Sequence, residues 1–476
     1  MQSRSTELLV FLPGGNHRPR RGPLVAHFNF WIRYKMANQN PLFSYNNLRP
    51  VMTHLDPLVR LQISTHCPSL QNVTSIVPMK IKYLEITRAD FKINSTTYSM
   101  GIIRKYNNRR NPRIVDGQNA LGGYQFDTDQ YGIRRNQRMV MPNVSDIENA
   151  ERELEETLRR KGRAANRGND LWELDGDIDT IEMRLDIYRA MLEIEDLPFT
   201  MYVQLMMIPD GGPPKVQYLV YNNKTLQEVK DHFMLKLFGY NTPIHVKNMN
   251  VARGIVLNPD DLGSIVNFER GPEYFLKSPY FPLEISKLKV SNLSSDWDIP
   301  ETLNAIRPVL DGSPLKIIKF DYSQILNNPD DPIIENCEFL NFTGDSPLEI
   351  LRRISNKRIH LEECNFTQVD ANNIVKHWRQ SNIKIGSHHS IGFRDGDDVQ
   401  KLLNSFRGMP GARSGDWEEL RATTFPECVI LPIGDHSEVN IYCETPKSQD
   451  AEYCDTQWIV RMKIQDKGFA DNLFID

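Results

Sequence analysis

Side chains that can bind a metal ion are most concentrated near the C-terminus. They are Cys428, His436, Cys443 and Cys454, with His388 and His389 nearby in the sequence. Thiols and imidazoles form tetrahedral zinc sites, in which some ligands normally lie within a few residues of each other. The intervals here are 8, 7 and 11 residues, and Cys428 and Cys443 fall in predicted strands. We therefore predict core thiols, with no metal site and no cofactor.

A second set of possible ligands is the alternating acidic run Asp175, Asp177 and Asp179, with Asp186 at the twelfth position. Calcium loops begin with this spacing. Thr180, however, replaces the glycine that forms the sharp turn of such a loop, and an aspartate is too short to replace the bidentate glutamate. The sequence therefore favours a solvated acidic face.

Catalytic motifs are missing from the sequence. It has no phosphate-binding loop, no dinucleotide fingerprint, no His-Glu-x-x-His motif and no nucleophile elbow. Because no catalytic triad or pair of acids can be identified from spacing, we assign no catalytic residue and expect a binding protein, not an enzyme. A hydrolase or transferase with an unrecognised site stays open as a third reading, which a buried cluster of Asp, Glu or His in a pocket would favour.

The composition is that of a globular chain. Its 476 residues are 40% hydrophobic and 25% charged, which suffices for about two to four domains. The 57 Lys and Arg side chains and 61 Asp and Glu side chains leave a net charge of -4. This charge gives no reason to expect nucleic acid as a partner, although a local basic patch stays open. No apolar stretch suits a membrane span or a secretory signal, so we expect a protein of the cytoplasm or nucleus.

The elements that would position these side chains are predicted mainly from one apolar pattern that recurs along the chain. It begins at Ile81-x-x-Leu84-x-Ile86-x-x-Ala89-x-Phe91 and has the spacing of a leucine-rich repeat, whose short strand points alternate side chains inward. We predict one parallel strand per repeat, and an ordinary parallel sheet with crossovers is the alternative. The positions of the later copies are Val246, Met249, Val251, Gly254 and Val256; Ile285, Leu288, Val290 and Leu293; Leu315, Ile318 and Phe320; Ile334, Cys337, Phe339 and Phe342; and Ile359, Leu361, Cys364 and Phe366.

Other segments add a hairpin, helices and antiparallel strands. Residues 201–208 and 215–221 flank a turn rich in Gly and Pro, which predicts a hairpin. Thr225 and Glu228 form a capping box at the start of the helix that follows. Further helices are predicted at 372–378 and 399–406, and antiparallel strands at 429–433, 438–443 and 458–464.

The N-terminal part has a different character. Residues 1–38 contain the basic run Arg18 to Arg21 and no packing pattern, which predicts a disordered extension, and Met36 offers an alternative start of translation. From 39 to 78 apolar residues recur at helical spacing, and Asp56-Pro57 predicts a second short helix that extends to about Ser64. Helices this short need a partner surface, which is either the next domain or another protein.

Several short segments form a recognisable set: Pro41-Leu42-Phe43-Ser44-Tyr45, Leu55-Asp56-Pro57, Arg60-Leu61, Cys67-Pro68-Ser69-Leu70 and Ile81-Lys82-Tyr83-Leu84. With them the sequence resembles a nematode-expanded family of F-box-like proteins, often called F-box C proteins. The uncharacterised domain that follows the F-box-like region in that family is similar to four further segments: His245-Val246-Lys247-Asn248, Ile359-His360-Leu361, Ile385-Gly386-Ser387-His388 and Glu438-Val439-Asn440-Ile441-Tyr442-Cys443.

The resemblance implies a substrate receptor. F-box helices dock on the Skp-type adaptor of a cullin-RING ubiquitin ligase, and the C-terminal domain presents an unknown client protein. A scaffold or recognition protein of the same family that has lost adaptor binding is the alternative. Carried over by position, the adaptor-binding residues are Leu42, Leu48, Val51, Leu55, Pro57 and Leu61, with Asp56 and Arg60 at the polar rim.

We therefore expect an α/β protein in which a short N-terminal F-box-like helical module precedes a leucine-rich-repeat-like domain of parallel strands with an antiparallel β segment. The predicted parts are 1–38, a disordered basic extension; 39–78, the F-box-like helices; 79–145, the first strands; 146–197, an acidic helical insertion or linker; and 198–470, an α/β repeat-like recognition domain.

Overall fold

The computed structural model describes residues 12–13 and most of residues 45–469. Within the second range it leaves out 58, 61–62, 64–66, 68–69, 71–72, 74–75, 88–89, 134–140, 168–170, 221–224, 239–242, 253–286, 296–298, 322–329, 345–346, 363–365, 382, 418–419, 422, 448–453 and 455. The predicted extension at 1–38 therefore lies almost entirely outside the described residues. None of the helices in the described ranges is both long enough and apolar enough to cross a bilayer.

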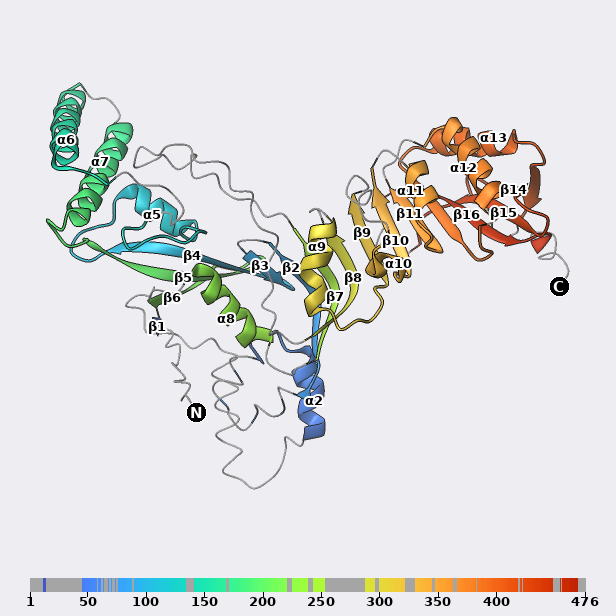
Figure 1. Cartoon of the computed structure of the whole chain (residues 1–476), viewed down its shortest axis with the longest axis horizontal. Coiled ribbons are helices and arrows are strands. Elements are labelled where there is room, and N and C mark those ends of the chain that lie inside the picture. Colours follow the sequence, from blue (N-terminus) through green and yellow to red (C-terminus); the bar gives the residue numbers. More distant parts are fainter. Residues whose placement is uncertain are drawn as a thin grey trace. The chain divides into compact units, whose positions relative to one another are not determined.

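The chain is a mixed α/β protein with parallel and antiparallel strands, as the sequence predicts. It divides into two compact units that are interleaved along the sequence (Figure 1). Unit 1 consists of Met1–Val77, Thr87–Thr242 and Gly254–Lys277. Unit 2 consists of Pro78–Ile86, Pro243–Arg253 and Ser278–Asp476.

Unit 1 is built on antiparallel strands in the order β1-β6-β5-β4-β3. The predicted hairpin is confirmed as β5 and β6, and so is the capping box of α8, in which Glu228 N donates to Thr225 Oγ1 at 3.1 Å and Thr225 N donates to Glu228 Oε2 at 2.7 Å. The strands are β1 (Leu12–Pro13), β3 (Asp90–Ile93), β4 (Thr96–Tyr106), β5 (Phe199–Pro209) and β6 (Lys215–Val220). The helices are α2 (Tyr45–His54), α5 (Arg113–Ala120), α6 (Val144–Ala165), α7 (Trp172–Met191) and α8 (Leu226–Phe238).

The acidic segment predicted between 146 and 197 forms the helices α6 and α7. They pack through a small apolar cluster in which Ile147 and Ala150 of α6 meet Ile181 and Leu185 of α7. Ion pairs flank the cluster, for example that of Arg189 with Glu151 at 2.7 Å. The two helices therefore bury an apolar stripe against each other while their acidic faces stay in water.

Arg104 of β4 is buried in unit 1 with a side-chain exposure of 4%. Its Nη2 donates to Tyr124 Oη at 2.7 Å and to Gly132 O at 3.0 Å, and its guanidinium lies 4.8 Å and 5.5 Å from the ring centres of Tyr124 and Phe199. Gly132 has φ +76°, and a Cβ there would lie 2.8 Å from Arg104 Nε. Only glycine satisfies both the backbone conformation and the close approach at this turn.

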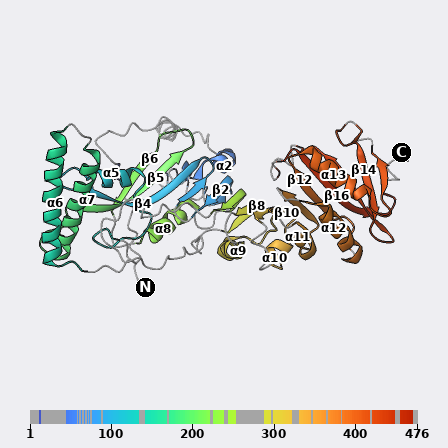
Figure 2. The same cartoon turned by 90° about the horizontal axis from the view of Figure 1, so that it is seen from above.

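Unit 2 begins with parallel strands in the order β2-β7-β8-β9-β10-β11-β12. Figure 1 shows α9 to α12 alternating with these strands, and Figure 2 shows the same helices along one side of them. The strands are β2 (Met79–Ile86), β7 (Ile244–Val251), β8 (Leu288–Ser295), β9 (Ile317–Asp321), β10 (Phe339–Thr343), β11 (Arg358–Glu362) and β12 (His388–Phe393). The helices are α9 (Ile299–Ile306), η3 (Arg307–Val309), α10 (Pro332–Glu335), α11 (Pro347–Arg353), α12 (Gln368–Ser381) and α13 (Gly396–Arg407).

The C-terminal strands of unit 2 are antiparallel, which confirms the prediction for this region. They continue from β12 in the order β16-β15-β14-β13. Their bounds are β16 (Trp458–Asp466), β15 (Ser437–Glu444), β14 (Glu427–Pro432) and β13 (Arg413–Asp416). The two helices predicted at 372–378 and 399–406 are likewise present, within α12 and α13.

The apolar rows predicted for the repeats form the core of unit 2. Strand pairing aligns Leu84, Met249, Leu293, Ile318, Leu340 and Ile359 in one row, and every member is buried. Among the described residues the repeat prediction is wrong at Phe91, which lies in the antiparallel strand β3 of unit 1, and at Phe339. The predicted positions Ala89, Gly254, Val256, Ile285 and Cys364 lie outside the described residues. Phe339 pairs with Ile317, so Leu340 takes the inward place on β10 and Phe339 points to the other face. Phe339 is buried nevertheless, because it stacks on His360 and lies under Arg358.

Candidate recognition surface

Polar side chains alternate with the apolar core positions along the parallel strands of unit 2. Because successive side chains of a strand point to opposite faces, they lie on the face opposite to the apolar rows. Two rows in register make up what we call the outer face. They are Glu85, Asn250, Ser294, Lys319, Asn341, His360 and Ser390, and Tyr83, Asn248, Asn292, Ile317, Phe339, Arg358 and His388.

The outer face over β2, β7 and β8 is a half-buried network of amides and hydroxyls. Asn250 Nδ2 donates to Glu85 Oε2 at 3.1 Å, and Ser294 Oγ donates to Asn250 Oδ1 at 3.0 Å. In the second row Asn292 Nδ2 donates to Asn248 Oδ1 at 2.8 Å. Each bond joins neighbouring strands and contributes about 0.5–1.5 kcal/mol. These side chains are therefore held in defined positions, as a specific binding surface requires.

Over β9 to β12 the polar row becomes buried. Lys319 Nζ of β9 and Glu362 Oε2 of β11 form an ion pair of 3.0 Å, which passes over β10 because these strands are not neighbours. Asn341 of β10 and His360 of β11 are fully buried, and His360 Nδ1 is hydrogen-bonded to Ser390 Oγ at 2.9 Å. The charged pair and the hydrogen bond between His360 and Ser390 hold the side chains of this part of the surface in place.

His388 lies among cations at the β12 end of the outer face. Strand register places it between Arg358 of β11 and Lys463 of β16. Burial, and then the charges of Arg461, Lys463 and Arg358, lower the pKa of His388 to about 3, so the imidazole is neutral at pH 7. Within the described part of the chain, His388 Nε2 is buried and has no hydrogen-bond partner.

The predicted adaptor-binding residues lie around α2 and the turn that follows it. Leu48 and Pro57 are buried, Leu55 and Asp56 are half-buried, and Val51 is 46% exposed. The packing of α2 also uses Met52, which is 1% exposed and which the sequence pattern contained but the resemblance did not select. Pro50 lies inside α2. Leu42 and Leu61 lie outside the described residues.

Arg60, predicted at the polar rim, is buried instead of lying at a surface. Its side-chain exposure is 3%, and its Nη2 donates to Val77 O at 2.7 Å. Burial lowers the pKa of the guanidinium to about 10, which leaves it charged at pH 7. Arg60 therefore ties the second helical segment to the end of the helical region.

The residues considered for metal binding do not form a cluster. Cys428 and Cys443 lie in β14 and β15, as the sequence predicts, and burial raises the pKa of each thiol to about 12. Asp175, Asp177 and Asp179 lie within the helix α7. Over the described ranges of the chain, no group of three or more His, Cys, Asp or Glu side chains is placed to hold a metal ion.

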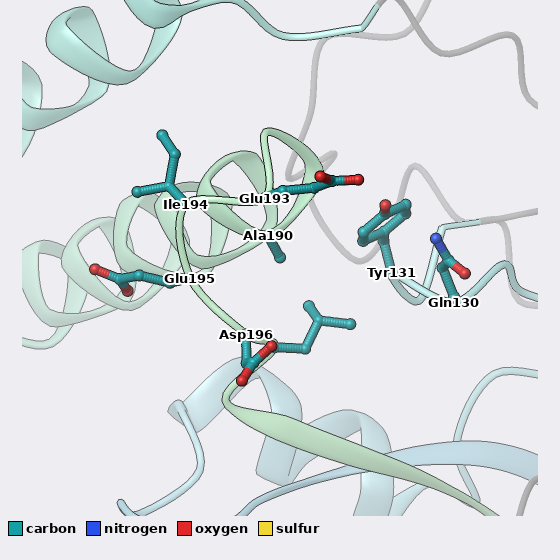
Figure 3. Close-up of a pocket in the computed structure, with 8 residues that line it drawn as sticks. Gln130, Tyr131, Ala190, Glu193, Ile194, Glu195 and Asp196 are labelled. Atoms are coloured by element: carbon teal, nitrogen blue, oxygen red, sulfur yellow. The ribbon is translucent and has the colours of Figure 1, made fainter.

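A pocket of about 450 Å³ lies in unit 1 at the C-terminal end of α7. Figure 3 shows the Glu193 carboxylate directed toward Tyr131. The acidic residues that line the pocket are exposed, and the carboxylate of Glu195 forms an ion pair of 3.8 Å with Arg189. This open site differs from the buried acid cluster that would favour an enzyme. The lining residues are Gln130, Tyr131, Ala190, Glu193, Ile194, Glu195, Asp196 and Leu197.

Comparison with known proteins matches part of unit 2 to a family. Residues 281–395 match a family described as a domain of unknown function, DUF3557. The matched range includes β8 to β12, which carry much of the outer face. No curated protein and no solved structure matches the chain.

Proposed function

We propose that the protein is an F-box-like substrate receptor, in which the α2 region docks on a Skp-type adaptor of a cullin-RING ubiquitin ligase and the outer face of unit 2 binds a client protein. The observation that carries the proposal is the outer face itself. It is a pair of polar rows on parallel strands, of which β7 to β12 follow one another in the chain. In leucine-rich-repeat-like proteins such faces bind other proteins. A ligase receptor of this kind works in the cytoplasm or nucleus.

The chemistry of the outer face supports binding. Its cross-strand hydrogen bonds join Asn248 to Asn292 and Glu85 to Asn250, which fixes donors and acceptors in place before a partner arrives. A surface that is ordered in advance loses less conformational entropy on association. A partner that supplies complementary polar groups would therefore be selected by hydrogen-bond geometry more than by apolar area.

The α2 region supports the adaptor half of the proposal less strongly. Among the predicted adaptor residues that the structure describes, Val51 is the most exposed, at 46%, and it lies between Leu48 and Leu55 in the sequence. An exposed branched apolar side chain on a short helix can contribute to an interface that buries it. The resemblance to F-box C proteins supplies the identity of that partner.

The test is capture of the full chain by a purified Skp-type adaptor, with Val51→Asp as the disrupting variant. Arg49→Asp is the matched control, because Arg49 is also exposed on α2 and receives the same new side chain. Circular dichroism checks that each variant stays folded. We expect wild type and Arg49→Asp to be captured and Val51→Asp to be lost. A folded wild-type chain that is not captured would refute the ligase role.

A second candidate is a recognition or scaffold protein that does not bind the adaptor. The observation that favours it is the burial of Leu48, Pro57 and Arg60, since side chains that stabilise unit 1 are not available to a partner. The same experiment separates the two candidates. Client binding through unit 2 without adaptor capture would support the scaffold.

A further inference from the structure

Lysine side chains line the amino ends of the parallel strands in unit 2. Lys80, His245 and Lys289 are in register across β2, β7 and β8, and all three are exposed. Two residues further along their strands, Lys82 and Lys247 are exposed as well. Each of these residues follows a buried apolar residue and is itself exposed. The alternation of buried and non-buried residues is interrupted once in each of β2 and β7, where Lys82 and Tyr83, and Lys247 and Asn248, are successive non-buried residues. The lysines therefore lie on the non-core side, as the outer-face rows do.

The row of lysines continues beyond β8. Lys316 N donates to Ser291 O at 2.7 Å, which places Lys316 beside the middle of β8, and Lys357 O accepts a hydrogen bond of 2.6 Å from His388 N at the start of β12. Both lysines are exposed, and Glu338 interrupts the row between them. The basic band, as we call it, consists of Lys80, Lys82, His245, Lys247, Lys289, Lys316 and Lys357.

The basic band departs from the charge of the whole chain, which is -4. Apart from Glu338, which interrupts the band, the acids of these strands lie toward their carboxyl ends, where Glu85 binds Asn250 and Glu362 binds Lys319. Within the described residues, Lys80, Lys289 and Lys316 make no ion pair. Positive potential is therefore concentrated at one edge of the outer face, which favours a partner of opposite charge.

The arrangement at the β12 end points to the same kind of ligand. Lys357 is followed by the exposed Arg358, which lies beside His388 in the strand register. The buried Nε2 of His388 has no partner among the described atoms. Because this nitrogen is closed off from solvent, the groups that a ligand can reach here are the exposed Lys357 and Arg358, whose charges attract an anion.

We propose that the basic band binds an acidic, extended segment of a partner polypeptide that crosses the strands. The proposal rests on the receptor role and names the chemical class of its client. From Lys82 to Lys357 the band crosses five strand-to-strand steps, or about 24 Å at about 4.8 Å per step. An extended peptide covers that distance with about seven residues at about 3.3 Å each.

The composition of the band favours polypeptide over nucleic acid. Proteins that bind single strands combine basic residues with exposed aromatic rings on which the bases stack. The aromatic residue nearest the band in sequence is Tyr83, which is half-buried and whose hydroxyl donates to Glu85. Lysine acts as a point charge and suits carboxylates at varied spacing, whereas arginine is preferred where planar phosphate recognition matters.

The test measures binding of a fluorescein-labelled (Glu-Ser)6 peptide to the full chain by fluorescence anisotropy, beside a dT12 oligonucleotide. The disrupting variant carries Lys80→Glu, Lys289→Glu and Lys316→Glu. The control carries three equal charge reversals at exposed positions outside the band, Arg352→Glu, Lys376→Glu and Lys467→Glu. Circular dichroism confirms the fold of both.

We expect the peptide to bind wild type and the control alike, with a Kd about tenfold higher for the band variant and a marked loss of binding in high salt. Equal weakening by both variants would show non-specific attraction and overturn the proposal. Tighter binding of dT12 than of the peptide would overturn it in favour of nucleic acid, and so would no peptide binding by a folded chain. Capture by the adaptor is measured separately on the same variants. If the adaptor does not capture the chain but the acidic peptide still binds, the ligase role is refuted and the proposal of an acidic client stands.

Discussion

Two adjacent histidines make the stability of unit 2 depend on pH. Burial lowers the pKa of His388 to about 3 and that of His389 to about 4, while an unperturbed histidine has a pKa of 6.5. In the unfolded chain both imidazoles take up a proton as the pH falls through 6.5, but in the folded chain they stay neutral. Stability that is present above pH 6.5 is therefore lost as the pH falls toward the folded pKa values.

The size of the effect follows from the two pKa differences. At pH 5 each imidazole is protonated in the unfolded chain and neutral in the folded chain. This difference lowers the free energy of unfolding by about 2 kcal/mol per histidine. The two together remove about 4 kcal/mol, a large part of the roughly 5–15 kcal/mol that holds a typical domain folded. His388→Gln and His389→Gln should each reduce the loss between pH 7 and pH 5 by about 2 kcal/mol.

Hydrogen exchange of peptides from β12 and β16, corrected for the intrinsic exchange rate at each pH, reports the opening free energy of unit 2 apart from that of unit 1. The opening free energy of each variant at pH 7 is subtracted from its value at pH 5. This subtraction removes the effect of lost packing, including the loss of the His389 ring beside Trp378. If both glutamine variants lose as much stability at pH 5 as the wild type does, the imidazoles are not held neutral and the reasoning fails.

Three further predictions concern stability. Gly132→Ala should destabilise unit 1 by about 2–4 kcal/mol in urea unfolding, and Gly211→Ala by about 1–2 kcal/mol. Both glycines have φ +76°, but of the two only Gly132 lies against Arg104. Equal losses of stability would contradict the contact between Gly132 and Arg104. Gly117→Ala should stabilise unit 1 by about 0.5–1 kcal/mol, because a Cβ at this position of α5 meets open space. The measurement is the thermal unfolding midpoint, which should rise. Lys319→Ala should lower the free energy of unfolding by about 1–2 kcal/mol. A double-mutant cycle with Glu362→Ala should show coupling between the two residues, and no measurable coupling would refute the ion pair.

The sequence predicted the core of unit 2 well because its signal is a spacing. Leu84, Met249 and Leu293 recur at equivalent positions, and burial of such positions is the strongest constraint on a strand. The prediction was one residue out on β10, where Phe339 is apolar but points to the outer face. An aromatic ring beside His360 and under Arg358 can be buried on either side of a sheet, and spacing alone does not tell which.

The outer face was not predicted, for a different physical reason. Asn248, Asn292 and Ser294 are ordinary polar residues between apolar ones, and their significance comes from neighbours that lie 44 residues away in the chain. The basic band has the same origin, since its lysines are separated by long segments and do not form a charge run. The division into units is also invisible in a sequence read in order, because β2 of unit 2 precedes almost all described elements of unit 1.

The early position of β2 has a consequence for synthesis of the chain. Met79 pairs with Ile244, so 165 residues must be added before β2 can meet its parallel partner. At about 5–20 residues per second, translation takes about 8–33 s over that stretch. During this time Ile81, Leu84 and Ile86 have no β7 to cover their strand edge, and such edges are prone to aggregation. Nascent chains stalled before residue 244 should accordingly depend on chaperones, whereas chains stalled beyond β8 should not.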